Sequence, residues 1–546
     1  MLRSYVASFV PRLRTLRKPV AAHRALHHRK RLLVLGVALS VVFVGALALL
    51  LLGCGGGNSA AIVPPPPTPA FQPLTQAEVT QIVTAAAVAA SADTMVVAVV
   101  DRQGKILGVF RKPNAPATAL GNFSSMEDAN DVAVALARTG AFFSNNQAPL
   151  TSRTVRFISG IHLPPGVMNQ PPADLYGIEN TNRGCTLSSE LEGNGFKPST
   201  PISGVKPLGI ITGKKDTSDS DPNTVNPGGI PLYRENVLVG GIGVTGVPSD
   251  VAEYAAFKGA TATGFGGLFS HLPPPGAVFL AGVVLPAVDN TSPPAGVGTG
   301  TVTGGTWFIA ATDGTGTPAE GDLVTPRAGP LGGLSVTEVM TILGNAEAEA
   351  NLTRAAIRLP EGSRARMAIA VADLDGTIIG LRRMADSTVF SIDVAATKAR
   401  NMVYFNSAAR LATDLNQVPT GTAVTNRTIS FGAMPLFPPG IDGSGNGPFF
   451  DLYTMDTANP CTQGFQSGAP NDKKSGIVFF PGSAGLYRNG VLVGGLGVSG
   501  DGVDQDDFVT SAGTKGFEAP TSIRADQLSI NGVRLPYFKF PRNPTD

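Results

Sequence analysis

Two cysteines stand at equivalent places in this chain and carry its clearest redox chemistry. Cys185 follows the triplet Asp-Leu-Tyr at 174–176, and Cys461 follows the same triplet at 451–453. The two thiols can form a disulfide, and the alternative is two buried or free thiols. The chain has no Cys-x-x-Cys-His motif for covalent haem and no cysteine pair spaced for zinc.

Two acidic clusters are further candidates for chemistry. The run DTSDSD at 216–221 could hold calcium, but it lacks the glycine and the distal bidentate glutamate of an EF-hand loop, so a polar disordered loop is the alternative. Asp504, Asp506 and Asp507 are predicted to begin a helix, where carboxylates interact favourably with the positive end of the helix dipole. No nucleophile and base pair and no metal triad is visible in the sequence.

Two glycine-rich runs, Gly240–Gly243 and Gly494–Gly497, lie inside strand patterns. They lack the Gly-Lys-[Ser/Thr] ending of a phosphate-binding loop. We expect them to permit a bulge or a close approach of another backbone segment.

These runs belong to a duplication. LYRENVLVGGIGVTG at 232–246 returns as LYRNGVLVGGLGVSG at 486–500, with eleven of fifteen positions identical. Three more segment pairs recur in the same order: 96–108 with 368–380, 131–138 with 393–400, and 151–166 with 425–440. The chain therefore contains two copies of one domain.

Each copy is predicted to open with a capped helix. Thr75 with Glu78, and Ser335 with Glu338, have the spacing of a capping box. The apolar residues that follow have helical spacing and are expected in the core.

The remaining elements are predicted from strand and turn patterns. Two β-rich runs joined by Asp-x-x-Gly, then a helix, a long loop, a second hairpin and a last helix give an α+β domain with an antiparallel sheet packed by helices. We expect the first domain at 74–290 and the second at 334–546, because a late Gly-Val-x-Leu-Pro motif recurs at 282–286 and 532–536. Residues 291–333 are expected to be a Gly/Thr-rich connector around Trp307.

The N-terminus reads as an export and anchoring segment. Residues 32–52 are uncharged and mostly apolar, long enough to cross a bilayer, and they follow nine Lys or Arg in residues 1–31. Leu51-Leu-Gly-Cys54 resembles a lipoprotein cleavage box that would place a lipid on Cys54, and an uncleaved membrane anchor is the alternative. Residues 1–54 are thus a signal or anchor, and residues 55–73 are a Gly/Pro-rich tether.

Either reading exports the rest of the chain to the cell envelope, on the periplasmic or extracellular side. Beyond residue 31 there are 33 basic and 40 acidic residues, a net charge of −7. That balance argues against nucleic acid as a partner, because phosphate binding needs clustered cations on the folded surface.

Three ordered motifs in the second copy carry a resemblance. Residues 391–399 (SIDVAATKA), 479–487 (FFPGSAGLY) and 495–500 (GLGVSG) followed by Asp504-Gln-Asp506 resemble the GlcG/HbpS family of haem-binding proteins. The first copy is similar in outline but departs from the pattern: Lys398 becomes Leu136, Ser391 becomes Ala129, and Gln505-Asp506 becomes Val251-Ala252.

The resemblance implies two tandem profilin-like domains that tend to oligomerise and bind haem or a related tetrapyrrole without a covalent bond. A cation at Lys398, assisted by Arg383 on the preceding strand, would pair with a propionate. The alternative is a solvated lysine and a structural arginine bonded to loop carbonyls. Asp393 lies in the same motif, and Arg111 is the counterpart of Arg383.

Iron ligands are few. His162 and His271 are the histidines beyond the N-terminal segment, and the second copy contains none. Either histidine could instead be an ordinary loop or core residue. Tyr176 and Tyr453, or the thiolates of the two later cysteines, could ligate iron.

Three functions compete. The first is an exported, anchored haem- or tetrapyrrole-binding accessory protein for scavenging or sensing, possible as a homo-oligomer. The second is an enzyme of haem breakdown or of small hydroxy acids, which would rest on family association alone. The third is a structural surface protein whose duplicated fold serves oligomerisation.

Overall fold

The structure is a computed structural model that describes residues 70–185, 187, 211–212, 226–266, 278–317, 319–465, 472–542 and 544–545. The predicted anchor at 32–52, the lipidation site Cys54, the acidic loop at 216–221 and His271 lie outside the described residues. Among the described residues, no helix has the length and apolar character needed to cross a membrane.

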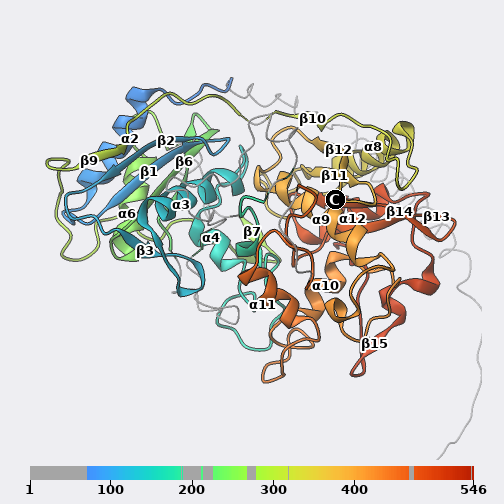
Figure 1. The fold of residues 1–546 in the computed structure, drawn as a ribbon. Coiled ribbons are helices and arrows are strands. Elements are labelled where there is room, and N and C mark those ends of the chain that lie inside the picture. The colour runs from blue at the N-terminus through green and yellow to red at the C-terminus, as the bar shows by residue number, and fades with distance from the viewer. Residues whose placement is uncertain are drawn as a thin grey trace, which may run out of the picture. The chain divides into compact units, whose positions relative to one another are not determined.

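Repeat one consists of an antiparallel sheet with helices on both faces, as the α+β prediction requires (Figure 1). Its helices are α2 (Gln76–Ala89), α3 (Ala129–Phe143), α4 (Ser152–Phe157) and α6 (Ser249–Ala260). Its strands are β1 (Val96–Asp101), β2 (Ile106–Arg111), β3 (Thr118–Leu120), β4 (Met126–Asp128), β5 (Gly229–Arg234), β6 (Val237–Thr245), β7 (Phe279–Leu280), β8 (Val283–Val284) and β9 (Thr306–Ile309).

Repeat two follows the same order of elements. Its helices are α8 (Val336–Leu352), α9 (Phe390–Phe405), α10 (Asn426–Gly432), α11 (Phe450–Ala458) and α12 (Val503–Gly513). Its strands are β10 (Gly321–Val324), β11 (Ala368–Ala372), β12 (Ile378–Arg383), β13 (Ser483–Arg488), β14 (Val491–Ser499), β15 (Ser529–Ile530) and β16 (Val533–Arg534).

The two main sheets have matching topology. The strand order is β5-β6-β1-β2-β9 in repeat one and, reading the other way, β13-β14-β11-β12-β10 in repeat two. The segment that the sequence analysis assigns to a connector supplies both terminal strands, β9 and β10, and Trp307 of β9 packs edge-on against Phe110 at 5.5 Å. An edge strand pairs through its backbone, so a Gly/Thr-rich segment can form one without a clear apolar pattern.

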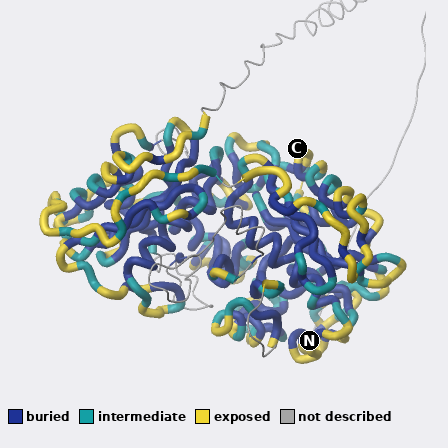
Figure 2. Tube along the Cα trace, turned by 45° about the horizontal axis from the view of Figure 1, so that its top comes forward, coloured by how far each residue is buried: buried dark blue, intermediate teal, exposed yellow. Residues whose placement is uncertain are grey.

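Burial on both faces explains the unbroken apolar runs of the central strands (Figure 2). Val96, Ala98 and Val100 of β1 face the cluster that contains α3, whereas Val97 and Val99 face α2 and α6. Repeat two divides β11 in the same way, and its α9 side shares one continuous core with the α3 side of repeat one. The repeats are thus joined through the helices α3 and α9.

The predicted capping boxes are confirmed at the starts of α2 and α8. The Thr75 side chain accepts a hydrogen bond from the backbone N–H of Glu78, and the Ser335 side chain accepts one from the backbone N–H of Glu338. The predicted close approach at the glycine-rich runs is also confirmed. A Cβ on Gly243 would stand 1.9 Å from the Ala133 carbonyl of α3, and one on Gly497 would stand 2.1 Å from the Ala395 carbonyl of α9. These glycines let each buried helix lie directly on the sheet.

Candidate functional site

A buried ion pair lies where α9 crosses β14 and α12. Lys398 of α9 and Asp506 of α12 are 0% and 2% exposed. The Lys398 Nζ donates to Asp506 Oδ2 at 3.0 Å and to the Val498 carbonyl at 2.7 Å, and it stands 4.9 Å from the centroid of the Phe480 ring. The lysine is therefore surrounded by protein and paired with an acid.

Local sequence creates the space for this pair. Asp506 lies in the first turn of α12, where the helix dipole favours a carboxylate. Gly482 has a φ of 113°, and a Cβ there would stand 2.6 Å from the Asp506 Cβ and 2.7 Å from the Lys398 Nζ. Only glycine leaves both side chains in place at this position.

Burial perturbs both groups. Desolvation raises the pKa of Asp506 to about 7, and the nearby Lys398 opposes that rise. Desolvation likewise lowers the pKa of Lys398, with Asp506 opposing. A carboxylate that titrates near neutrality can hold or release a proton under physiological conditions.

Hydroxyl groups continue the polar site along the start of α9. The Ser499 Oγ donates to the Ser391 Oγ at 3.2 Å, and the Ser391 Oγ lies 2.7 Å from the Thr388 Oγ1. All three residues are buried.

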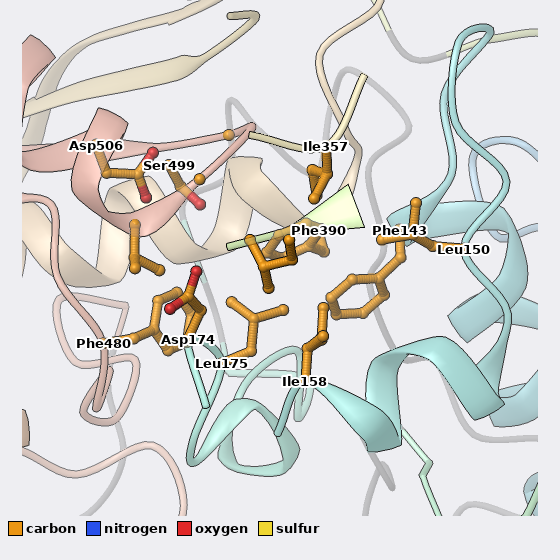
Figure 3. Close-up of a pocket in the computed structure, with 14 residues that line it drawn as sticks. Phe143, Leu150, Ile158, Asp174, Leu175, Ile357, Phe390, Phe480, Ser499 and Asp506 are labelled. Carbon is orange, nitrogen blue, oxygen red and sulfur yellow. The ribbon is translucent and has the colours of Figure 1, made fainter. Parts of the chain in front are cut away.

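A cavity adjoins these groups between the two repeats (Figure 3). Its volume is about 20 Å³, room for a ligand little larger than a water molecule. Repeat one supplies Phe143, Leu150, Ile158, Asp174, Leu175 and Leu280, and repeat two supplies Ile357, Phe390, Phe480, Ser499, Gly500, Gly502, Val503 and Asp506. In Figure 3 the Asp174 carboxylate lies next to Leu175 and points toward the side of the cavity where Ser499 and Asp506 lie.

Repeat one has no equivalent of this polar site. Leu136 stands at the place of Lys398, Ala129 at that of Ser391 and Ala252 at that of Asp506, and all three are buried apolar residues. A second ion pair is nevertheless kept in both repeats. Arg153 bonds Glu253 at 2.7 Å, and its counterpart Arg427 bonds Asp507 at 2.5 Å.

The two predicted arginines bind loop carbonyls. Arg383 is 0% exposed, and its guanidinium donates to the Ser387 and Ala319 carbonyls, with burial lowering its pKa to about 10. Arg111 donates to the carbonyls of Ala115 and Pro116. Neither arginine lies among the residues that line the cavity.

Asp393 binds the other repeat. Its Oδ2 accepts from the backbone and side-chain nitrogens of Asn182, both at 2.8 Å, and burial raises its pKa to about 6. This carboxylate ties the start of α9 to the loop that follows Tyr176.

His162 is the one histidine among the described residues, and both its ring nitrogens have protein partners. The Nε2 lies 3.1 Å from Asp442 Oδ1, and the Nδ1 lies 3.3 Å from the Gln170 carbonyl. Tyr453 is 0% exposed and stacks on its counterpart Tyr176 with centroids 5.1 Å apart. Neither His162 nor Tyr453 is among the residues that line the inter-repeat cavity.

The two later cysteines form a disulfide between the repeats, Cys185–Cys461, with a sequence separation of 276. Of the two alternatives open from the sequence, the structure has the bonded form. Like the Tyr176–Tyr453 stack, it joins residues of the two repeats.

Three site residues escaped the sequence analysis as site residues. Asp506 and Ser499 lie in the motifs that carry the family resemblance, but neither was given a role in a site, and Asp506 was otherwise placed at the start of a helix. Asp174 was assigned only to a recurring triplet. One signal was available for Asp506: it is replaced together with Lys398 in repeat one. No signal pointed to Asp174, because its counterpart Asp451 is also an aspartate and lies on the surface.

The fold and the site define a two-repeat α+β protein in which one repeat keeps a buried polar site at a cavity. Comparison with known families finds a match for that second repeat. Residues 345–515 match the HbpS-like family model, described as haem degrading protein HbpS-like. The resemblance of the second repeat is thereby confirmed, and the match includes Ser391, Lys398 and Asp506.

Two solved structures are similar to this chain. One is titled the crystal structure of a PduOC:haem complex, with 21% identity, a TM-score of 0.23, and coverage of 34% of this chain and 97% of that chain. The other is the Klebsiella pneumoniae protein ORFY, family-model DUF336, with 16% identity, a TM-score of 0.21, and coverage of 34% and 90%. No curated protein matches the chain.

Proposed function

We propose that this protein binds haem or a related tetrapyrrole non-covalently, and that the second repeat provides the binding function. The observation that carries the proposal is the match of residues 345–515 to the HbpS-like family. The loss of the buried polar residues from repeat one supports an unequal division of function between the repeats.

The proposal includes location and architecture. The two repeats would be tandem profilin-like domains, anchored in the cell envelope on its periplasmic or extracellular side through a lipidated Cys54 or an uncleaved segment at 32–52. The Cys185–Cys461 disulfide supports export, because such bonds persist in oxidising compartments. Fusion of two domains would supply a pairing within one chain, and association of several chains is part of the same proposal.

The inter-repeat cavity formed by the described residues is too small and too acidic for haem. A cavity of about 20 Å³ is far below the 300 Å³ or more typical of cofactor pockets. Its two carboxylates, Asp174 and Asp506, would also repel the propionates. Among the described residues no side chain stands free to ligate iron there, so we derive no chemistry through the metal.

An aromatic strip at the end of repeat two suits a tetrapyrrole better. Phe508 packs edge-on against Phe540 at 5.6 Å, and Phe538 lies 6.3 Å from Phe540, which is 50% exposed. The side chain of Lys539, 65% exposed, lies between the two last phenylalanines in sequence. A macrocycle would stack on the exposed Phe540 ring, and a propionate would share Lys539 with Asp504, its present partner at 3.1 Å.

A haemin titration of the full-length protein in detergent, followed by absorbance, tests the proposal. We expect a saturable Soret shift with one haem per chain. Phe540→Ser and Lys539→Gln should each weaken binding severalfold, and Phe308→Ser should not, because Phe308 is a 52% exposed phenylalanine on β9 of repeat one.

Two results would overturn parts of this proposal. No Soret shift in protein that is folded by circular dichroism would rule out haem as the ligand. A shift that is lost in His162→Ala but kept in Phe540→Ser would move the haem site to repeat one.

A further inference from the structure

The cavity between the repeats contains an acid that lacks a hydrogen-bond partner. Asp506 is 2% exposed, its Oδ2 binds Lys398, and its Oδ1 has no partner. A buried acceptor without a partner is destabilising because it has lost its hydrogen bonds to water, and more so when it is charged. A ligand that donates a hydrogen bond to this oxygen would remove that penalty.

Asp174 is the second acid at the cavity, and it comes from repeat one. It is half-buried, and among the described residues it makes no hydrogen bond or ion pair. Burial and the nearby Asp504 raise its pKa to about 6, although Lys539 and Arg427 oppose the rise.

The neighbouring cations already have partners. Lys398 pairs with Asp506, and Arg427 pairs with both Asp504 and Asp507. Lys539 pairs with Asp504 at 3.1 Å. Asp501, which also faces Asp506, is paired with Arg358. Asp174 is thus the one carboxylate of this group without a cation at ion-pair distance, and the cavity lacks one positive charge.

The rest of the wall is suited to a small organic cation. Phe143, Phe390 and Phe480 offer aromatic rings, which attract ammonium groups. The Ser499 Oγ donates to Ser391 and so keeps its lone pairs for a donor on the ligand. The volume of about 20 Å³ restricts the occupant to very few heavy atoms.

We infer that the cavity between the repeats is a binding site for a small monovalent ammonium compound of the size of methylammonium, held between Asp506 and Ser499 of repeat two and Asp174 of repeat one. The site needs both repeats, so one such ligand binds per chain. This inference does not rest on haem binding, because it uses a different surface and the opposite charge.

Calorimetric titration of the full-length protein with methylammonium chloride tests the inference, with methanol as the neutral isostere and sodium acetate as the anion. At pH 8 we expect saturable binding of methylammonium at one per chain and no saturation with methanol or acetate. Affinity should fall at least tenfold from pH 8 to pH 5, because Asp506 and Asp174 then become protonated.

A pair of matched variants locates the ligand. Asp174→Asn should weaken methylammonium binding at least tenfold, and Asp451→Asn should leave it unchanged, because Asp451 is the exposed counterpart in repeat two. Asp174 has no partner to lose, so its variant should fold, which circular dichroism checks.

Three results would overturn the inference: no saturation with methylammonium, equal affinity in Asp174→Asn and the parent, or equal binding of methanol. Each is independent of the haemin titration, so either proposal can fail while the other stands.

Discussion

The two repeats share the topology of their main sheets but differ in the residues that the buried helix places beside the sheet. In repeat one, α3 packs on β6 and carries Leu136, while α6 carries Ala252. In repeat two, α9 packs on β14 and places Lys398 against Asp506 of α12. The glycines that let helix meet sheet are present in both. The comparison shows that the same backbone holds either an apolar packing or a buried ion pair, so the polar pair is not required by the fold.

The largest expected loss of stability comes from replacing one residue of the ion pair in repeat two by its counterpart in repeat one. Lys398→Leu leaves Asp506 buried without its cation and should lower the free energy of unfolding by about 3–5 kcal/mol. The double variant Lys398→Leu/Asp506→Ala reproduces the residues of repeat one and should recover most of that loss. Urea unfolding of the single and double variants measures both. Equal losses in the two variants would show that the pair is not coupled.

The bond that joins the repeats should have the next largest effect. Replacing Cys185 and Cys461 by serine opens a closed loop with a separation of 276 residues and should lower stability by about 2–5 kcal/mol. Guanidinium unfolding with and without a reductant measures the difference. A reductant that destabilises the double-serine variant as much as the parent would contradict this assignment.

The pH dependence of stability should report on the buried acids, most of which lie in repeat two, although the pKa of Asp174 of repeat one is also raised to about 6. The raised pKa values of Asp393, Asp456 and Asp506, about 6, 8 and 7, lie in repeat two, and each exceeds the value of about 3.9 in an unfolded chain. The folded state therefore holds protons that the unfolded state releases, so stability should fall as pH rises from 5 to 8. Each of these acids contributes up to about 1.4 kcal/mol per pH unit below its folded-state pKa.

Unfolding free energies at pH 5 and pH 8 measure this fall. Asp456→Asn should flatten the profile, whereas Asp451→Asn, at an exposed position on the same helix, should not. A stability that rises between pH 5 and pH 8 would show that ion pairing dominates over burial for these acids.

The smallest expected effect tests what the repeats share. Thr75→Ala and Ser335→Ala each remove the side chain that caps the first helix of a repeat, and each should lower stability by about 1 kcal/mol. Thermal unfolding of the two variants should give closely similar shifts. A much larger shift in one of them would mean that the opening helices are unequally anchored.

Much of the fold was accessible from the sequence because its determinants are local. Capping boxes, the helical spacing of apolar residues and β-rich runs joined by Asp-x-x-Gly predicted the opening helix and the first hairpin of both repeats. The edge strands β9 and β10 were missed because their pairing is made by backbone atoms and leaves little trace in the side chains. The site was only partly accessible. Lys398 was identified through a resemblance, but its burial and its pairing with Asp506 were not.

By itself, the sequence determined that this chain contains two copies of one α+β domain and that only the second copy keeps Lys398, Ser391 and Asp506. Those conclusions depend on residue order, which a duplication makes directly comparable. The tertiary structure alone decided that Arg383 and His162 bind protein groups, that Cys185 bonds Cys461, and that Asp174 of one repeat faces the cavity of the other. The contacts of His162 with Asp442 and of Cys185 with Cys461 join residues hundreds of positions apart, so no local preference of the chain encodes them. The bond of Arg383 to the Ser387 carbonyl is local, but the burial of the guanidinium is not.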